Sequence, residues 1–297
     1  MTTQSADIRT VAVLGCGLMG AGIAQVSAAA GYSTIVHDVN QTQVARGRAA
    51  IEKSLAKLVE KGKLTPSDRD AALARLSFAT DLAATAGSDL VIEAVTEDLA
   101  LKNRLWAELD GLCPPGTIFA SNTSSIPIGS MAAATRRPDR FVGLHFFNPV
   151  ALMPLVEVVR PAAASRETFE RSLAFARSLG KETVVAKDAP GFIVNLLLVP
   201  YLLDAVRALE NGVGTVVDID TAMRLGCGYP MGPFTLLDVV GIDTVVRISE
   251  IMLAEYHDPR YSAPALIRRM AAAGRYGRKS GKGFYDYSVD PPAPSPA

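Results

Sequence analysis

Two polar residues lie in neighbouring apolar segments of this 297-residue chain and could act together as a general base. His145 comes near the end of an apolar run that begins at Phe141, and Glu157 comes 12 residues later, within the apolar run 155–159. A neutral imidazole takes up a proton near neutral pH, and an adjacent carboxylate fixes its tautomer and raises its basicity. A core histidine is usually structural, and a glutamate in a strand can face solvent, so the spacing leaves both interpretations open.

Further polar residues follow two other apolar segments. The run Ser-Asn-Thr-Ser-Ser at 121–125 comes directly after a predicted strand, and Glu97 and Lys102 follow a predicted buried strand at 89–95. Ligands of open α/β sheets collect at the carboxyl ends of the strands, so we expect these side chains to border one crevice. Glu97 could also be an ordinary acid at a helix start, and Lys102 an ordinary surface base.

A glycine turn follows the first apolar strand, 11–14, and predicts a dinucleotide-binding site. Gly15 permits the tight turn, Gly17 lets a pyrophosphate approach the backbone, and Gly20 lets the following helix pack closely on the strand. The pyrophosphate would then meet the unpaired N–H groups at the helix N-terminus. The predicted cofactor-binding residues of this turn are Gly15, Gly17, Leu18, Met19 and Gly20. The alternative is a tight turn that binds nothing.

Asp38 ends the second predicted strand and indicates which dinucleotide binds. It lies 18 residues beyond Gly20, the spacing of a carboxylate that accepts hydrogen bonds from the adenine ribose hydroxyls. A carboxylate there would repel the 2′-phosphate of NADP, and the next residues, Val39 and Asn40, include no arginine to offset the repulsion. NAD is therefore the predicted cofactor.

A long helix is predicted from the N-cap Asn40 to about Lys61, followed by a second helix that begins near residue 65. Together they form a helical hairpin inserted between the second and third strands. Lys53, Lys57 and Lys61 fall on the face of the first helix opposite its apolar stripe. These lysines are either an ordinary solvated face, which their spacing alone favours, or a cationic ridge for the phosphates of an extended substrate.

The chain is predicted to contain two domains. Residues 1–187 predict an α/β domain with a mostly parallel, doubly wound sheet of the Rossmann type, and the turn-rich segment 187–191 is a natural hinge. Residues 188–297 predict an all-helical domain, with helices over about 192–211, 217–225, 235–256 and 263–273. The proline-rich tail from about residue 288 is expected to be disordered.

Composition excludes several classes of protein. The 30 basic residues balance the 30 acidic ones, so no global field recruits nucleic acid. Three cysteines without C-x-x-C spacing indicate neither a metal site nor a disulfide framework and suit a reducing cytoplasm. The polar N-terminus has no signal-peptide core, and the most apolar run, 192–206, is broken by Asn195, Pro200 and Asp204, so we expect no membrane span.

Six motifs resemble the L-3-hydroxyacyl-CoA dehydrogenases, and the stand-alone bacterial 3-hydroxybutyryl-CoA dehydrogenases look most similar. They occupy residues 15–25, 121–125, 145–149, 190–195, 232–234 and 279–285. The motifs occur in order and at family spacing, and the match runs from about residue 9 to residue 287. One departure, at 150–154, bears on chain-length preference, because many members have Pro at position 151 and Lys at position 154.

The resemblance implies roles for the candidate catalytic residues. His145 matches the catalytic base and Glu157 its partner, while Ser124 and Asn195 match the groups that hold the C3 oxygen of the substrate. The implied reaction is the reversible, NAD-dependent oxidation of an L-3-hydroxyacyl-CoA, of short chain such as 3-hydroxybutyryl-CoA, to a 3-ketoacyl-CoA. The implied fold is an eight-stranded NAD domain joined to a helical domain through which two chains form a homodimer.

The resemblance also implies binding residues. Ser54 and Lys61 match positions that contact coenzyme A, which favours the ridge interpretation of the lysines. The positions that contact the cofactor in the family are matched here by Glu97, Lys102, Asn148 and Lys279.

Two alternatives remain. The first is an NAD-dependent dehydrogenase of a free hydroxy acid or sugar acid. Enzymes of the 6-phosphogluconate type are disfavoured, because they have a lysine where this chain has Gly191. An L-gulonate-type enzyme shares the His–Glu pair, and only the lysine ridge argues against it. The second alternative is a nonenzymatic paralogue, which would be expected to lack one of the four catalytic candidates; all four are present.

Overall fold

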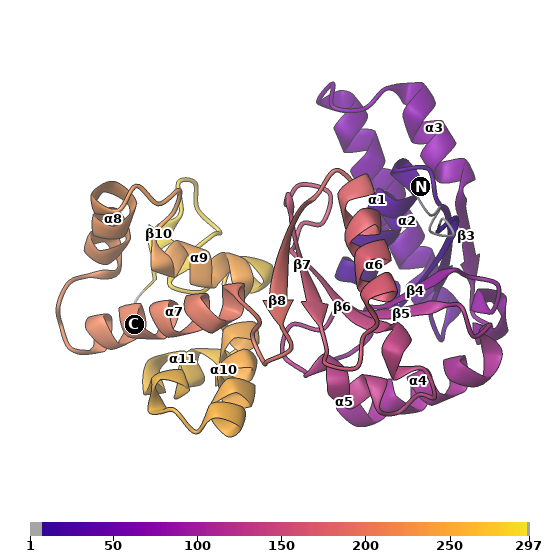
Figure 1. The fold of residues 1–297 in the computed structure, drawn as a ribbon. Coiled ribbons are helices and arrows are strands. Elements are labelled where there is room, and N and C mark those ends of the chain that lie inside the picture. Colours follow the sequence, from indigo (N-terminus) through magenta and orange to yellow (C-terminus); the bar gives the residue numbers. More distant parts are fainter. Residues whose placement is uncertain (1–7, 296–297) are drawn as a thin grey trace. The chain divides into compact units, whose positions relative to one another are not determined.

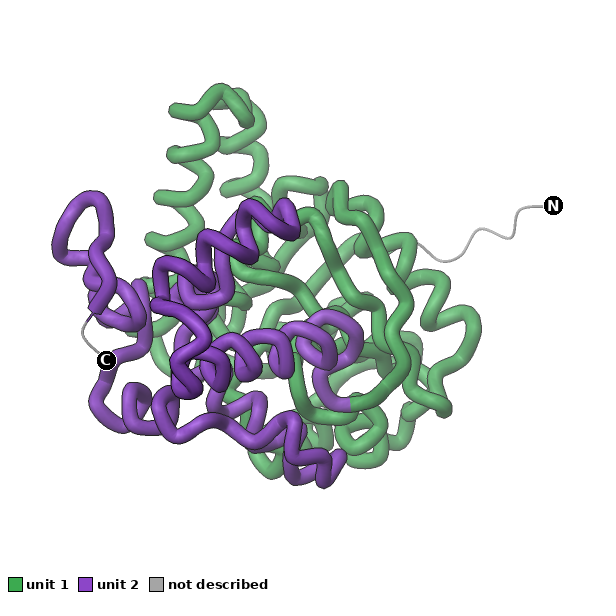
Figure 2. Tube along the Cα trace, turned by 90° about the vertical axis from the view of Figure 1, so that its left-hand side faces the viewer, with its two compact units in different colours: residues 1–189 green, residues 190–297 purple. Residues whose placement is uncertain are grey.

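The computed structural model describes residues 8–295, and the chain divides into two compact units, residues 1–189 and 190–297 (Figure 2). The division falls two residues beyond the predicted boundary between residues 187 and 188. Most of the N-terminal stretch that we expect to hold no signal peptide, and the last two residues of the tail, lie outside the described residues.

Unit 1 is built on an eight-stranded sheet with the strand order β3-β2-β1-β4-β5-β6-β7-β8 (Figure 1). Neighbouring strands are parallel except for β6 and β7, which are antiparallel. The strands are β1 (Thr10–Leu14), β2 (Ser33–His37), β3 (Leu76–Ala79), β4 (Leu90–Glu93), β5 (Ile118–Ser121), β6 (Phe141–Phe146), β7 (Leu155–Arg160) and β8 (Glu182–Lys187). The predicted mostly parallel sheet is confirmed.

Helices cover both faces of the sheet, as a doubly wound fold requires (Figure 1). The α-helices of unit 1 are α1 (Leu18–Ala29), α2 (Gln41–Glu60), α3 (Pro66–Ala74), α4 (Leu99–Leu112), α5 (Ile128–Ala132) and α6 (Arg166–Ser178). Ile23 of α1 and Phe175 of α6 share one apolar cluster with Ile118 and Ala120 of β5. Side chains alternate along a strand, so Phe119 faces the other way, and there it packs against the buried Trp106 of α4.

The helices α2 and α3 form the predicted hairpin between β2 and β3. Asn40 caps α2 by accepting a hydrogen bond from Gln43 N–H at 2.8 Å, and Thr65 caps α3 by accepting one from Asp68 N–H at 3.1 Å. Ile51 and Leu55 of α2 are buried, whereas Lys53 on the opposite face is exposed. Capping and periodicity together explain why both helices could be predicted closely.

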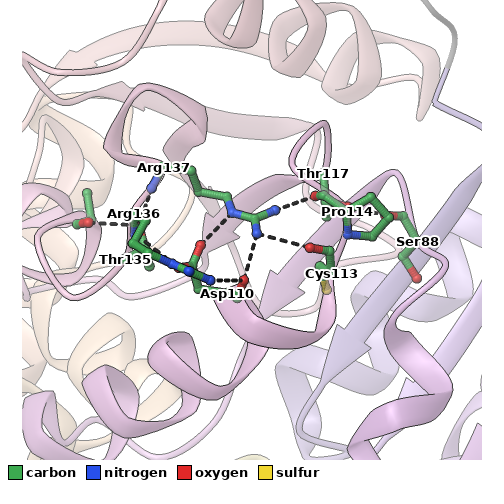
Figure 3. A network of polar contacts seen from close by, with 9 residues as sticks. Ser88, Asp110, Cys113, Pro114, Thr117, Thr135, Arg136 and Arg137 are labelled. Carbon is green, nitrogen blue, oxygen red and sulfur yellow. Dashed lines mark hydrogen bonds and ion pairs between the residues drawn. The ribbon is translucent and has the colours of Figure 1, made fainter.

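A buried ion pair fixes the segment that leads into β6. The guanidinium of Arg137 donates to Asp110 Oδ1 at 2.6 Å and to the carbonyl oxygens of Asp110, Cys113 and Pro114 (Figure 3). These contacts tie the segment before β6 to the end of α4. Burial alone would raise the pKa of Asp110, but hydrogen bonds from Arg136 and Arg137 outweigh it and hold that pKa below its ordinary value.

Unit 2 is helical, with one difference from the predicted helices. Its α-helices are α7 (Val194–Glu210), α8 (Val216–Gly226), α9 (Pro233–Val240), α10 (Ile242–Tyr256) and α11 (Ala265–Ala272). The prediction of one continuous helix over 235–256 is wrong, because Gly241, at φ +101°, separates α9 from α10. The backbone N–H of Ile242 then donates to the carbonyl oxygen of Tyr276 at 3.1 Å.

The tail is ordered as far as residue 295, so the expectation of disorder from about residue 288 is wrong for these residues. The strands β9 (Tyr285–Asp286) and β10 (Ala293–Pro294) pair in antiparallel register. The backbone N–H of Ser295 donates to the carbonyl oxygen of Phe284 at 2.8 Å, so the proline-rich segment packs back on its own unit. No helix within residues 8–295 is long and apolar enough to cross a membrane.

Candidate active site

His145 and Glu157 form a close, buried pair in unit 1. They are Cα partners in the antiparallel register of β6 and β7, and both side chains leave the same face of the sheet. His145 Nδ1 lies 2.6 Å from Glu157 Oε2, and the two residues are 6% and 0% exposed. The centroids of the Phe147 ring and the His145 imidazole are 4.5 Å apart. The spacing of 12 residues therefore corresponds to direct contact, and the alternative in which Glu157 faces solvent is wrong.

The same face of the sheet carries further polar residues at its carboxyl edge. Glu93 ends β4 and Ser121 ends β5, and the register pairs them across the two parallel strands. The next partner in β6 is Gly143, and His145 lies two residues further along that strand on the same face. Four adjacent strands thus place polar side chains along one edge, where ligands of open α/β sheets bind.

The turn after β5 is fastened on both sides of Ser124. Asn122 Oδ1 accepts a hydrogen bond from Phe146 N–H at 2.9 Å, which joins the turn to the end of β6. The hydroxyls of Thr123 and Ser125 both donate to Glu97 Oε1, the second at 2.9 Å. Ser124 lies between them and is half-buried. The predicted catalytic residues Ser124, His145 and Glu157 are therefore held by neighbouring strand ends of one unit.

Lys102 and Glu97 also lie at this edge. The Lys102 ammonium is 2.6 Å from Glu93 Oε1 and 3.0 Å from Glu97 Oε2. Burial alone would raise the pKa of Glu97, but the charge of Lys102 and the hydrogen bonds from Thr123 and Ser125 bring that pKa below its ordinary value. Sequence reasoning assigned Glu93 only to a strand, although a charged residue that ends an apolar run was a usable signal.

The glycine turn has the predicted local geometry. Gly15 has φ +93°, and a Cβ there would lie 2.7 Å from the carbonyl oxygen of Ala94. A Cβ on Gly20 would lie 1.8 Å from the carbonyl oxygen of Gly15, so only glycine lets α1 approach the turn. Gly17 is the N-cap of α1 without a side-chain cap, and a Cβ there would meet no atom within 4 Å. The first N–H groups of α1, which include those of Leu18 and Met19, thus have no side-chain cap.

Asp38 and Cys16 contact each other at this turn. Asp38 Oδ2 accepts a hydrogen bond from Cys16 N–H at 2.8 Å, so the carboxylate is fixed beside the glycines. Burial, with a contribution from the Asp38 charge, raises the pKa of the Cys16 thiol to about 11. Since the thiolate is the reactive form, the thiol acts as packing and not as a nucleophile.

A pocket of about 350 Å³ lies in unit 1 beside the glycine turn. Its walls come from the start of α1, one face of α2 and the loop after β6, and they include the predicted residues Gly17, Leu18, Ser54 and Asn148. One cavity thus joins positions matched to the cofactor and a position matched to coenzyme A.

The pocket also contains residues that the sequence interpretation did not assign, namely Gln25, Gln43 and Arg46. The available signal was helical spacing. Residues 43, 46 and 50 precede Ser54 at intervals of three or four, so all four residues share one face of α2. Gln25 is 3% exposed, an unusual burial for a side-chain amide on a helix that packs on a sheet.

The remaining predicted residues are Lys61 in unit 1 and Asn195 and Lys279 in unit 2. Lys61 is the C-cap of α2 and is exposed, like Lys53 and Lys57. Asn195 belongs to unit 2, where it occupies the first turn of α7 and is half-buried. Lys279, also in unit 2, has its ammonium 2.6 Å from Asp243 Oδ1. Among residues 8–295, no group of three or more side chains is arranged to hold a metal ion.

Known proteins match the chain over nearly its whole length. The model of the 3-hydroxyacyl-CoA dehydrogenase NAD binding domain matches residues 10–189, and the model of the C-terminal domain matches residues 191–287. A 3-hydroxybutyryl-CoA dehydrogenase of Mycobacterium tuberculosis is 49% identical over 96% of this chain and 100% of its own length. The human mitochondrial hydroxyacyl-coenzyme A dehydrogenase is 46% identical over 94% of this chain and 91% of its own length.

A solved structure agrees with these sequence matches. The (S)-3-hydroxybutyryl-CoA dehydrogenase PaaH1 from Ralstonia eutropha superposes with a TM-score of 0.91 at 42% identity, covering 95% of this chain and 100% of that chain. That solved structure therefore shares the fold described above. This chain belongs to the 3-hydroxyacyl-CoA dehydrogenase family of oxidoreductases.

Proposed function

We propose that this protein oxidises the 3-hydroxyl group of a short-chain L-3-hydroxyacyl-CoA, such as 3-hydroxybutyryl-CoA, with NAD⁺, and that it catalyses the reverse reduction. The observation that carries the proposal is the buried contact of 2.6 Å between His145 Nδ1 and Glu157 Oε2 at the carboxyl edge of the sheet. Relatives named 3-hydroxybutyryl-CoA dehydrogenase support the choice of substrate.

The glycine turn fits a dinucleotide. The open position in front of Gly17 and the uncapped N–H groups of α1 suit a pyrophosphate, since both the helix dipole and the unpaired donors favour an anion. One carboxylate oxygen of Asp38 accepts a hydrogen bond from Cys16 N–H. The other oxygen would accept a hydrogen bond from a ribose hydroxyl. Asn148 borders the same pocket. The bound nicotinamide ring would supply the hydride acceptor.

His145 is the general base of the proposed reaction. Its Nδ1–H donates to Glu157, so the neutral ring presents Nε2 as the acceptor of the hydroxyl proton. Once His145 is protonated, the carboxylate stabilises the imidazolium, and the buried setting strengthens that interaction. In the reverse direction, the protonated ring gives its proton to the oxygen that forms at C3. Ser124 and Asn195 would orient that oxygen.

Ser54 and Lys61 would bind coenzyme A. Ser54 lines the pocket beside the glycine turn, and Lys61 stands two helical turns further along α2 at its exposed end. Coenzyme A carries phosphates far from the reacting carbon, so the exposed lysine side chains near the end of α2 suit it better than they suit a small free acid.

The quaternary structure and location form part of the same proposal. A homodimer through unit 2 is supported by exposed apolar side chains on α7, α8 and the segment between them, with Leu197 at 69%, Val213 at 75% and Leu225 at 71% exposure. A monomer in sedimentation at micromolar concentration would contradict the homodimer.

The free thiols of Cys16, Cys113 and Cys227 support a reducing, cytoplasmic location.

A substrate comparison with the purified protein tests this function. NADH oxidation is measured with acetoacetyl-CoA, with longer 3-ketoacyl-CoA thioesters and with free acetoacetate, and NAD⁺ reduction is measured with L-gulonate. We expect the highest kcat/KM with acetoacetyl-CoA and about a hundredfold lower value or less with free acetoacetate, because the binding energy of coenzyme A is lost. Equal turnover of free acetoacetate or L-gulonate would favour a dehydrogenase of free acids instead. A preference for longer thioesters would contradict the short-chain assignment.

A further inference from the structure

The loop between β6 and β7, residues 147–154, forms one wall of the pocket beside the glycine turn. Its residues 148–151 line the cavity of about 350 Å³, together with residues of α1 and α2. Within the loop, the backbone N–H groups of Leu152 and Met153 both donate to the carbonyl oxygen of Pro149 at 2.9 Å. A segment outside helices and strands opens at a low cost in free energy, so the place of this wall depends on contacts from outside the loop.

The first outside contact is apolar. Val150 is 4% exposed and belongs to the apolar cluster of unit 1. It packs on Gly22 of α1, where an added Cβ would lie 2.8 Å from the Cβ of Val150. The glycine therefore lets the loop come close to the helix that follows the glycine turn.

The second outside contact is the side chain of Lys181. Its Nζ donates to the carbonyl oxygen of Val150 at 2.6 Å and to that of Met153 at 2.8 Å. Lys181 is half-buried, and burial lowers the pKa of its ammonium. One side chain thus holds two carbonyl oxygens that lie three residues apart, and it fixes the shape of the loop as well as its place.

The backbone of Lys181 is fixed on both sides. Before it, the N–H of Gly180 donates to the carbonyl oxygen of Arg177 at the end of α6, at 2.9 Å. After it, the N–H of Glu182 donates to the carbonyl oxygen of Pro154 at 2.8 Å, where β8 begins to pair with β7. The side chain of Lys181 therefore connects a fixed point of the sheet to the loop.

We propose that Lys181 is a positioning residue for the loop 147–154 and, through that loop, for the binding of cofactor and substrate in the pocket. Its two hydrogen bonds keep Val150 against α1 and the wall in place. The contact between His145 and Glu157 does not depend on them, because the register of β6 and β7 builds it. Without Lys181 the loop would leave this position for part of the time, and binding would weaken by that fraction.

The inference rests on the proposed function in one respect, because that function places coenzyme A in this pocket through Ser54. The cofactor enters through Asn148, which belongs to the loop itself. Loss of Lys181 should therefore act on binding and leave the proton transfer intact. A variant that merely folds less completely would instead show a smaller kcat at unchanged KM, since fewer molecules would be active.

The test compares Lys181→Met, which keeps the length of the side chain and removes its donors, with Arg104→Met. Arg104 is exposed on α4, so its substitution removes one positive charge away from the loop. Lys181→Arg is the rescue variant, because a guanidinium retains N–H donors for both carbonyl oxygens. The measurements are kcat and KM with acetoacetyl-CoA, the Kd of NADH, and the amide hydrogen exchange of residues 150–153.

For Lys181→Met we expect KM and the Kd of NADH to rise about three- to tenfold, as for a loop that is in place about a third to a tenth of the time. The kcat should stay within about threefold of the wild-type value. Exchange in residues 150–153 should become faster, because the loop opens more often. Arg104→Met should resemble the wild type, and Lys181→Arg should stay within about threefold of it in KM and Kd.

A second variant keeps the inference testable if Lys181→Met folds poorly. Lys181→Gln is shorter and uncharged but compatible with water, and it should show the same rise in KM and Kd. Unchanged KM and Kd, with or without faster exchange, would overturn the inference, and so would a lower kcat at unchanged KM and Kd. A wild-type protein inactive on acetoacetyl-CoA would instead contradict the proposed function, while the NADH and exchange measurements would still decide the role of Lys181.

Discussion

Glu157 lies directly opposite His145 across the antiparallel β6–β7 pair, and its Oε2 is 2.6 Å from the imidazole Nδ1. This is the one antiparallel pairing in the eight-stranded sheet. Directly opposed residues of such a pair have closely spaced Cβ atoms, so the register alone brings carboxylate and imidazole together. The contact between His145 and Glu157 is therefore built by the sheet and needs no loop to assemble it.

Substitution of the carboxylate should impair the reaction without removing the base. Glu157→Gln retains the shape of the side chain and a hydrogen-bonding group but cannot stabilise an imidazolium. We expect kcat to fall about ten- to a hundredfold, with a smaller change in the Kd of NADH. Steady-state kinetics and fluorescence titration measure the two quantities. A Glu157→Gln variant with wild-type kcat would show that the pair is only structural.

Asp38 should determine the preference for NAD over NADP. The Cys16 N–H holds its carboxylate at the turn, where a 2′-phosphate would meet a negative charge. Replacing Asp38 by Ser and Val39 by Arg should narrow or reverse the ratio of kcat/KM for the two cofactors. Val39 is 83% exposed, so an arginine fits there without repacking. Comparable use of NADPH and NADH by the wild type would contradict this role.

The exposed lysines of α2 should matter only for a substrate that carries phosphates. Lys61→Glu is expected to raise KM for acetoacetyl-CoA severalfold or more, because repulsion replaces attraction at the end of the helix. The effect should shrink as salt is added, since exposed charges are screened. Kinetics at low and high ionic strength check both statements.

The matched control for Lys61→Glu is a short pantetheine thioester of acetoacetate, which lacks the phosphates. Its KM should be nearly unchanged by the substitution. Equal losses with both substrates would mean that the lysine serves folding of the hairpin. An unchanged KM with both substrates would mean that Lys53, Lys57 and Lys61 form an ordinary solvated helix face.

The Asp110–Arg137 pair should contribute to stability in a pH-dependent way. Asp110→Asn leaves the buried Arg137 without a charged partner and should lower the free energy of unfolding by about 3 to 5 kcal/mol at neutral pH. The folded-state pKa of Asp110 is depressed, so its contribution is complete above the unfolded-state pKa of about 3.9 and is lost as the pH falls through the folded-state value.

Urea unfolding of the wild type and the variant at several pH values checks this stability prediction. The difference between the two proteins should narrow as the pH falls below about 3.9. Arg136→Met provides the control, because that side chain is 82% exposed and should matter far less. A difference that stays constant down to the lowest pH at which both proteins fold would contradict the account of Asp110.

Much of unit 1 could be predicted because its signals are local. The apolar strands, the N-cap Asn40, the start of the second helix near residue 65 and the glycine turn each depend on a few neighbouring residues, and the structure places them as predicted. The contact between His145 and Glu157 needed one more fact, the antiparallel direction of β7. Spacing cannot supply that direction, which is why the sequence left the pair open.

The differences between prediction and structure come from tertiary contacts. Residues 235–256 are apolar at helical spacing, and the break at Gly241 is accompanied by a hydrogen bond from Ile242 to the distant Tyr276. The tail is ordered to residue 295 through its pairing with β9. Lys102 had a readable signal: it lies four residues before the buried Trp106, on the face of α4 that packs inward.

The most direct test of the central claim is a comparison of His145→Ala with the wild type. Acetoacetyl-CoA-dependent NADH oxidation measures kcat, and fluorescence titration measures the Kd of NADH. If His145 is the general base, kcat should fall about a hundred- to ten-thousand-fold while NADH binding stays nearly intact. A variant that keeps more than about a tenth of the wild-type kcat would show that the base lies elsewhere.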